Sequence, residues 1–329
     1  MVKKRLAVLL LLLAAATFSA SAAGRIPRRL NRGLDSLVYT FYAPLADKPV
    51  KLYTYIPTKG KVQDMPVLIT FHGAERSGMN GIICWREWAE KDGFIVISPE
   101  FAKKYYSEDE YQFGGVVDPD TGKIRPEELW TYSIVEPIFD FVKGLTKNKS
   151  EKYNIQGHSA GGQFTHRFLI AKPDARVDRA VVCNPGSWTW CDPSGRIMAS
   201  EETFTWPYSI NGTPFNDRAH LESFFGRTFF VCLGSKDNNP SGKAVPNDIA
   251  SRQEGSHRLE RGQNFYASMK EVAEREGFPF NWNISIVEGI GHQGRGMVYG
   301  KRNADGKYSS GAFSKTAAWY LIFGDRENN

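Results

Sequence analysis

Residues 157–161 read Gly-His-Ser-Ala-Gly, a G-x-S-x-G pattern that is typical of a serine nucleophile on a sharp turn between a strand and a helix. The glycines belong to this pattern because a Cβ atom at either position would clash within the tight turn. A short apolar segment at 153–156 precedes the pattern and a helical segment at 160–171 follows it. We therefore predict that the Ser159 hydroxyl attacks a carbonyl carbon, and that the start of the helix stabilises the resulting oxyanion.

A serine hydroxyl needs a general base, and His292 is the best placed of the six histidines. It lies in a glycine-rich loop at 288–294, directly after an apolar segment at 282–287 that has the pattern of a strand. This position brings an imidazole to the same edge of the sheet as Ser159. His257 is a weaker alternative because it opens a helical segment among polar residues.

The third group should be a carboxylate at another strand end, between Ser159 and His292 in the chain. Asp237 fits this position because it comes shortly after the apolar segment 229–233. Its role would be to hold the tautomer of His292 and to stabilise the imidazolium. Asp217 and Asp248 are the alternatives, but neither follows an expected strand.

Short apolar segments alternate with helical patterns along the chain, as in a sheet of parallel strands covered by helices. The expected strands lie at 50–56, 67–71, 94–97, 153–156, 180–183, 229–233 and 282–287. The expected helices lie at 82–92, 134–145, 160–171, 265–277 and 313–323. We predict an α/β fold with a mainly parallel sheet, helices on both faces, and a single domain over residues 23–329.

Two stretches, at about 101–130 and 185–226, interrupt this alternation and are rich in aromatic residues. Both follow expected strands, and loops at that edge of the sheet surround the site in this architecture. We hypothesise that Trp188 and Trp190 form a wall of the substrate pocket and favour short-acyl or aromatic esters, for example on plant or algal carbohydrate. The alternative is that these rings only pack the insertion onto the domain.

Residues 1–22 are predicted to be a secretory signal peptide, which implies a secreted or periplasmic protein. Basic residues precede an apolar run at 6–16, and Ala-Ser-Ala at 20–22 supplies a cleavage signal before Ala23. This run is too short to span a bilayer and no comparable one follows, so no membrane span is expected.

Charge and motifs argue against several other classes of protein. Removal of residues 1–22, which hold three basic and no acidic residues, lowers the formal net charge from +6 to +3. Arginines crowd 25–32, but no basic stripe continues through the chain, so a nucleic-acid partner is not expected. The chain has no C-x-x-C, H-E-x-x-H or phosphate-binding glycine loop, so neither a metal nor another cofactor is expected.

The four cysteines allow two interpretations in an exported protein. Three of them, at 84, 183 and 232, have apolar neighbours and are typical of buried free thiols. Cys183 and Cys191 are close enough along the chain for a local disulfide. The sequence leaves this choice open.

These motifs resemble those of the α/β-hydrolase superfamily, and more narrowly those of secreted esterases of the polyhydroxybutyrate-depolymerase and feruloyl-esterase type. The segments that carry the resemblance are 71–73, 98–101, 157–162, 184–186, the loop around Asp237, and 289–292. The resemblance implies that the backbone N–H groups of Ala74 and Ala160 bind the oxyanion. It also implies a Ser-His-Asp triad formed by Ser159, His292 and Asp237.

The leading functional hypothesis is a serine carboxylesterase that forms an acyl-enzyme on a small-molecule or carbohydrate-linked ester. One alternative is a serine peptidase of the same fold. The other is an exported binding protein that uses a hydrolase scaffold without catalysis. The sequence leaves the oligomeric state open.

Overall fold

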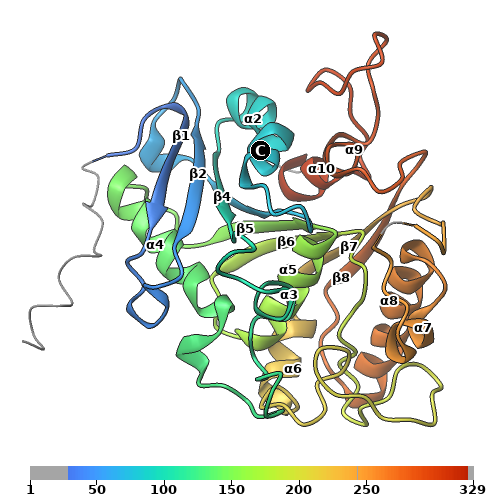
Figure 1. The fold of residues 1–329 in the computed structure, drawn as a ribbon. Helices are drawn as coiled ribbons and strands as arrows, with labels where there is room; N and C mark the ends of the chain where they lie inside the picture. The colour runs from blue at the N-terminus through green and yellow to red at the C-terminus, as the bar shows by residue number, and fades with distance from the viewer. Residues whose placement is uncertain (1–28, 243, 325–329) are drawn as a thin grey trace, which may run out of the picture.

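An eight-stranded sheet forms the centre of the computed structural model, which describes residues 29–242 and 244–324 (Figure 1). The predicted signal peptide lies outside the described residues. The strands are β1 (Gly33–Tyr39), β2 (Val50–Ile56), β3 (Val67–Phe71), β4 (Ile95–Glu100), β5 (Tyr153–His158), β6 (Val177–Cys183), β7 (Thr228–Gly234) and β8 (Trp282–Val287). Their order in the sheet is β1-β2-β4-β3-β5-β6-β7-β8.

The sheet is mainly parallel, which confirms the predicted fold class. β2 pairs antiparallel with both β1 and β4, whereas the neighbours from β4 through β3, β5, β6 and β7 to β8 pair in parallel. Each predicted strand is present, and β1 adds an edge that was not predicted. Because the parallel strands all point the same way, the loops that follow β3, β5, β7 and β8 meet at one edge.

The helices pack on both faces of this sheet (Figure 1). They are α2 (Gly78–Asp92), α3 (Glu108–Gln112), α4 (Val135–Thr146), α5 (Ala160–Ala171), α6 (Arg218–Phe225), α7 (Ile249–Glu254), α8 (Arg258–Glu276), α9 (Gly294–Tyr299) and α10 (Ala318–Phe323). The last helix begins at Ala318, later than the predicted 313, and the short helices α3, α6, α7 and α9 were not predicted. In the described ranges, no helix combines the length and the apolar composition needed to cross a bilayer.

Two apolar cores hold these layers together. Alternate residues of a strand enter opposite cores: Ile69 of β3 packs with residues of α4, α5 and α8, whereas Leu68 packs with residues of α2, α9 and α10. This alternation follows from the two-residue period of side chains along a strand. It requires strands that are apolar on both faces, and β3 is buried along its whole length.

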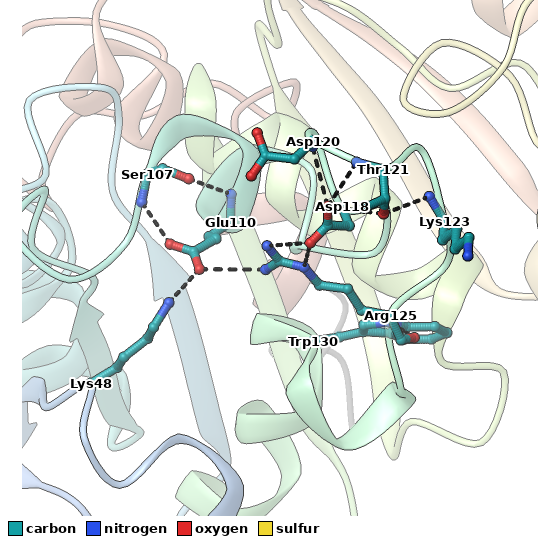
Figure 2. A network of polar contacts seen from close by, with 9 residues as sticks. All are labelled: Lys48, Ser107, Glu110, Asp118, Asp120, Thr121, Lys123, Arg125 and Trp130. Atoms are coloured by element: carbon teal, nitrogen blue, oxygen red, sulfur yellow. Dashed lines mark hydrogen bonds and ion pairs between the residues drawn. The ribbon is translucent and has the colours of Figure 1, made fainter.

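The insertion at 101–130 has little regular structure, and polar contacts fix its course. Ser107 and Glu110 cap α3 reciprocally, with each side chain bonded to the other's backbone N–H at 3.2 and 3.0 Å. Figure 2 shows Arg125 between two carboxylates: its guanidinium lies 3.2 Å from Asp118 and 3.6 Å from Glu110. Lys48, from the loop before β2, also pairs with Glu110. The contacts of Arg125 stabilise the insertion internally, and the contact of Lys48 links it to the loop before β2.

All four cysteines lie within the described residues and carry free thiols. The local bridge between Cys183 and Cys191 is therefore absent, and the free-thiol interpretation holds. Cys183 ends β6 and pairs in register with Cys232 of β7, while the Cys191 thiol lies 3.6 Å from the backbone oxygen of Thr189. Cys183 belongs to the apolar core that contains Leu68, and Cys191 to the core that contains Ile69, so the two side chains lie in different layers although they are close in sequence.

Candidate active site

Ser159 sits on a strained turn between β5 and α5. Its φ of 58° and ψ of −120° lie outside the usual regions for a residue with a side chain. The turn closes tightly, because a Cβ atom on Gly157 would lie 2.0 Å from the backbone oxygen of Gly161, and one on Gly161 would lie 2.2 Å from that of Phe71. The Ser159 N–H donates to the Cys183 carbonyl at 2.9 Å, which fixes the turn against β6.

His292 reaches Ser159 from the loop between β8 and α9. Its Nε2 lies 2.9 Å from Ser159 Oγ. Asn184, at the end of β6, supports this loop by donating to the Gly291 carbonyl at 3.3 Å and accepting from the Gly234 N–H at 2.8 Å. The imidazole is thus held at hydrogen-bond distance from the hydroxyl, as a general base must be.

Asp237 completes a hydrogen-bonded chain from the loop after β7. Its Oδ2 lies 2.7 Å from His292 Nδ1, and the side chain is only 6% exposed. Its other oxygen lies 3.4 Å from Nη1 of Arg258, the first residue of α8. Sequence reasoning missed Arg258, because nothing local marks it as a partner of a loop residue. A neutral His292 in this arrangement donates to Asp237 and accepts from Ser159.

The alternative residues lie elsewhere and have structural roles. Asp217 caps α6, Asp248 caps α7 and His257 caps α8, each accepting from a backbone N–H in the first turn of its helix. Of the candidates weighed, the structure brings only Ser159, His292 and Asp237 together.

Ala74 and Ala160 occupy the two positions expected for oxyanion donors. Ala160 begins α5 directly after Ser159, and Ala74 lies in the loop after β3. Within the described residues, neither backbone N–H is used in a hydrogen bond. Both therefore remain able to donate to a bound oxygen.

The loop that holds Ala74 is braced by residues 101–112, which we call the strap. The Arg76 guanidinium donates to the strap carbonyls of Phe101, Tyr106 and Ser107 at 3.0, 3.2 and 3.0 Å. The Tyr111 ring lies under this guanidinium at 4.3 Å, and the Tyr111 hydroxyl donates to a backbone oxygen, that of His72, at 2.7 Å. These contacts restrict the motion of the loop that carries Ala74.

The imidazole of His72 joins the same brace. Its Nε2 accepts the Phe101 N–H at 3.0 Å, and its Nδ1 faces the Gly73 carbonyl at 3.0 Å. Burial lowers the pKa of His72 to about 3, so it stays neutral and keeps one acceptor and one donor nitrogen. Arg76 and the strap were not predicted to support the site.

A cavity of about 360 Å³ opens beside Ser159. Residues of the loop after β3, of α2 and of the start of α9 line it together with His158, Ser159 and His292. Its lining includes one carboxylate, Glu75, and one guanidinium, Arg295. Burial holds the pKa of His158 well below its usual range, so this imidazole, 4.6 Å from that of His292, adds no charge. No group of three or more His, Cys, Asp or Glu among the described residues is arranged to hold a metal ion.

The prediction that Trp188 and Trp190 form a wall of this cavity is wrong. The two side chains are 0% and 1% exposed, and neither lines the cavity. Trp188 instead stacks on Phe265 of α8 at 4.2 Å between ring centroids. Trp190 contacts the same Phe265 ring edge to face at 5.7 Å, so both rings pack the insertion onto the domain.

A buried polar network surrounds Trp188. The carboxyl group of Glu254 accepts the Trp188 N–H at 3.1 Å, and the guanidinium of Arg261 donates to the Gly186 carbonyl at 2.7 Å. Arg167 of α5 donates to Thr189 Oγ1 at 2.8 Å. Burial raises the pKa of Glu254 to about 8, against the opposing effects of Arg261, the Trp188 N–H and Arg167.

These buried groups predict a stability maximum near neutral pH. His72, His158 and His166 stay neutral in the fold, so below their ordinary pKa of about 6.5 only the unfolded chain gains their protons, and acid destabilises the protein. Glu254 acts with the opposite sign, because between about 4.5 and 8 the folded protein keeps a proton that the unfolded chain releases. Below pH 6.5 the three imidazoles have a larger effect on the free energy of unfolding than the one carboxyl group. Between pH 6.5 and 8 the effect of Glu254 dominates.

We therefore expect the free energy of unfolding to fall by about 2 kcal/mol between pH 6.5 and 8, and this fall to vanish in Glu254→Gln. Urea unfolding followed by tryptophan fluorescence would measure it. Glu151→Gln, at an exposed residue before β5, is the control and should behave as the wild type. Equal slopes in Glu254→Gln and the wild type would contradict the prediction.

Comparison with known proteins gives clear structural relatives. No family model and no curated protein sequence matches the chain. The structure is similar to that of poly(aspartic acid) hydrolase-1 from Sphingomonas sp. KT-1, with a TM-score of 0.75 and 32% identity over 81% of this chain and 96% of that one. It is also similar to LpqC, a poly(3-hydroxybutyrate) depolymerase from Bordetella parapertussis, with a TM-score of 0.73 and 26% identity over 81% of this chain and 88% of that one.

Proposed function

Because the chain belongs to the α/β-hydrolase superfamily and is an esterase-type hydrolase, we propose that it is an exported serine carboxylesterase with Ser159, His292 and Asp237 as its triad. The observation that carries the proposal is the unbroken hydrogen-bonded chain of these side chains, with distances of 2.9 and 2.7 Å. Export rests on the predicted signal peptide at residues 1–22.

The geometry supports a two-step acyl transfer. His292 Nε2 takes the proton of Ser159 Oγ as that oxygen bonds to the ester carbonyl carbon. The carbonyl oxygen gains negative charge, which the N–H groups of Ala74 and Ala160 and the start of α5 stabilise. The C–O bond to the alcohol then breaks, and the alcohol leaves with the proton held by His292. Water, deprotonated by the same imidazole, hydrolyses the acyl-enzyme and restores the Ser159 hydroxyl.

Asp237 orients the base throughout this cycle. It accepts the Nδ1–H of His292 and thereby leaves the lone pair of Nε2 facing Ser159. When His292 becomes an imidazolium, the nearby carboxylate stabilises the positive charge. The contact with Arg258 fixes the orientation of the carboxylate from its other side.

We propose a short-acyl ester as the substrate, free or linked to carbohydrate. A cavity of about 360 Å³ is near the small end of ligand sites and suits a short acyl group better than a long alkyl chain. The buried positions of Trp188 and Trp190 remove the argument for an aromatic acyl group. The names of the two similar proteins make the end of a polymer chain the second candidate.

A fluorophosphonate probe tests the enzyme assignment directly. We expect the wild-type protein to gain one probe mass, located on the peptide that contains Ser159, and Ser159→Ala to gain none. When the full chain is expressed in an exporting host, the same spectrum should show a protein that begins at Ala23. Equal labelling of both proteins, or no labelling of either, would contradict the proposed nucleophile.

A further inference from the structure

The loop after β3 places a carboxylate in the Ser159 cavity. Glu75 lines this cavity and comes one residue after Ala74. Its side chain folds back over Gly73, since a Cβ atom on Gly73 would lie 2.6 Å from Glu75 Oε2. The absence of a side chain at position 73 therefore leaves the space that this carboxylate occupies.

Glu75 is exposed to solvent, and no described residue neutralises its charge. Within residues 29–242 and 244–324, Glu75 has no hydrogen bond and no ion pair. Its charge still acts on the cavity wall: burial raises the pKa of Cys84 to about 12, with Arg295 opposing the rise and Glu75 adding to it. The Cys84 thiol thus lies within electrostatic reach of both charged groups of the cavity.

Arg295 makes its contacts with residues other than Glu75. Its Nη2 donates to the Tyr308 carbonyl at 3.0 Å and lies 3.8 Å from a carboxylate oxygen of Glu87. It is the only cation among the described residues that line the cavity. No ion pair joins Arg295 to Glu75 across the described part of the cavity.

A free carboxylate at this position opposes the reaction of a neutral substrate. The transition state places negative charge on the oxygen that Ala74 is proposed to bind, and the carboxylate of Glu75 in the same cavity repels this charge through the screening solvent. A cationic group on the substrate would remove this repulsion and would itself be attracted to Glu75. The effect of Glu75 on the rate should therefore depend on the charge of the substrate.

We propose, on the basis of the proposed function above, that Glu75 binds an ammonium group of the substrate. The enzyme then selects esters that carry a cationic group within a few atoms of the carbonyl carbon. Glu75 acts as a specificity-determining residue, and Ser159, His292 and Asp237 carry out the bond changes.

The test compares p-nitrophenyl esters of β-alanine, butyric acid and succinic acid, which have similar acyl lengths and are cationic, neutral and anionic near pH 7. We expect wild-type kcat/KM to be highest for the β-alanine ester and lowest for the succinate. In Glu75→Gln, kcat/KM for the β-alanine ester should fall about 3-fold while that for the succinate rises by a similar factor. High salt should weaken the wild-type preference. Glu151→Gln removes one charge before β5, at the opposite edge of the sheet, and should change none of these values.

A second pair of substrates covers a cation on the alcohol side of the ester. Acetylthiocholine carries a positive charge on its alcohol side and S-butyl thioacetate is neutral. Glu75→Gln should reduce the preference for acetylthiocholine. The inference would be overturned if Glu75→Gln changed the charge preference of neither series, or lowered kcat/KM equally for every ester. Hydrolysis of the butyrate ester by the wild type, lost in Ser159→Ala, would leave the proposed function standing in that case. If the wild type hydrolysed no ester, both proposals would fail.

Discussion

Replacing His292 by alanine is expected to lower kcat for ester hydrolysis by about 10³-fold or more, and Ser159→Ala should cost a similar factor. His292 Nε2 lies 2.9 Å from Ser159 Oγ, and no other base lies at hydrogen-bond distance from that hydroxyl in the described structure. Because the two residues act as one unit, the double variant should be little slower than either single variant. Steady-state kinetics with p-nitrophenyl butyrate, on variants whose circular dichroism matches the wild type, would measure this.

The rate loss in Asp237→Asn can be compared with the losses in Ser159→Ala and His292→Ala. This substitution leaves the nucleophile and the base in place and disturbs the tautomer of His292, so we expect a smaller loss than for Ser159 or His292. Near-normal turnover by His292→Ala would exclude His292 as the base. Losses in the double variant that equal the product of the single losses would show that the two residues act independently.

The second large effect is expected from the glycines of the turn. Gly161→Ala places a Cβ atom 2.2 Å from the Phe71 carbonyl oxygen, and Gly157→Ala places one 2.0 Å from the Gly161 oxygen. Both contacts are with backbone, which cannot rotate away. We expect each variant to lose more than about 4 kcal/mol of unfolding free energy, or not to fold, as judged by urea unfolding.

Gly144 is the matched control for these substitutions. It lies in α4, and a Cβ atom there would have no atom within 4 Å apart from its chain neighbours and the backbone of its own helix. Gly144→Ala should therefore stabilise the protein by up to about 1 kcal/mol, since alanine favours the helix. Similar stabilities for Gly161→Ala and Gly144→Ala would contradict the close approach of backbones at the turn.

The buried strands and the relative placement of Ser159, His292 and Asp237 could be predicted because both follow from local pattern and a general rule. An apolar run such as 67–71 indicates a strand covered on two faces, and parallel strands bring their following loops to one edge. β1 was missed because its apolar residues do not share one buried face: Leu34 and Val38 are 48% and 57% exposed. α9 was missed because two of its six residues are glycines.

The contacts between distant segments could not be predicted in the same way. An aromatic residue after a strand can line the site or pack in the core, and Trp188 packs in the core against Phe265 of α8. Arg76 and Arg258 find their partners across the fold, and neither carries a local signal. Glu75 did have one, since it directly follows Ala74 in the sequence, but adjacency alone does not show that a side chain folds back into the cavity.

Because the contacts between Arg76 and the strap hold the Ala74 loop, the thermal stability of the active site can differ from that of the sheet. The eight-stranded sheet is expected to resist unfolding as a unit, whereas the strap is mainly irregular chain, held by the hydrogen bonds of Arg76 and by the buried rings of Phe101, Tyr106 and Tyr111. A local opening of the strap would release the loop that carries Ala74 and leave the sheet intact. We therefore expect activity to be lost on heating at a lower temperature than the one at which the sheet unfolds.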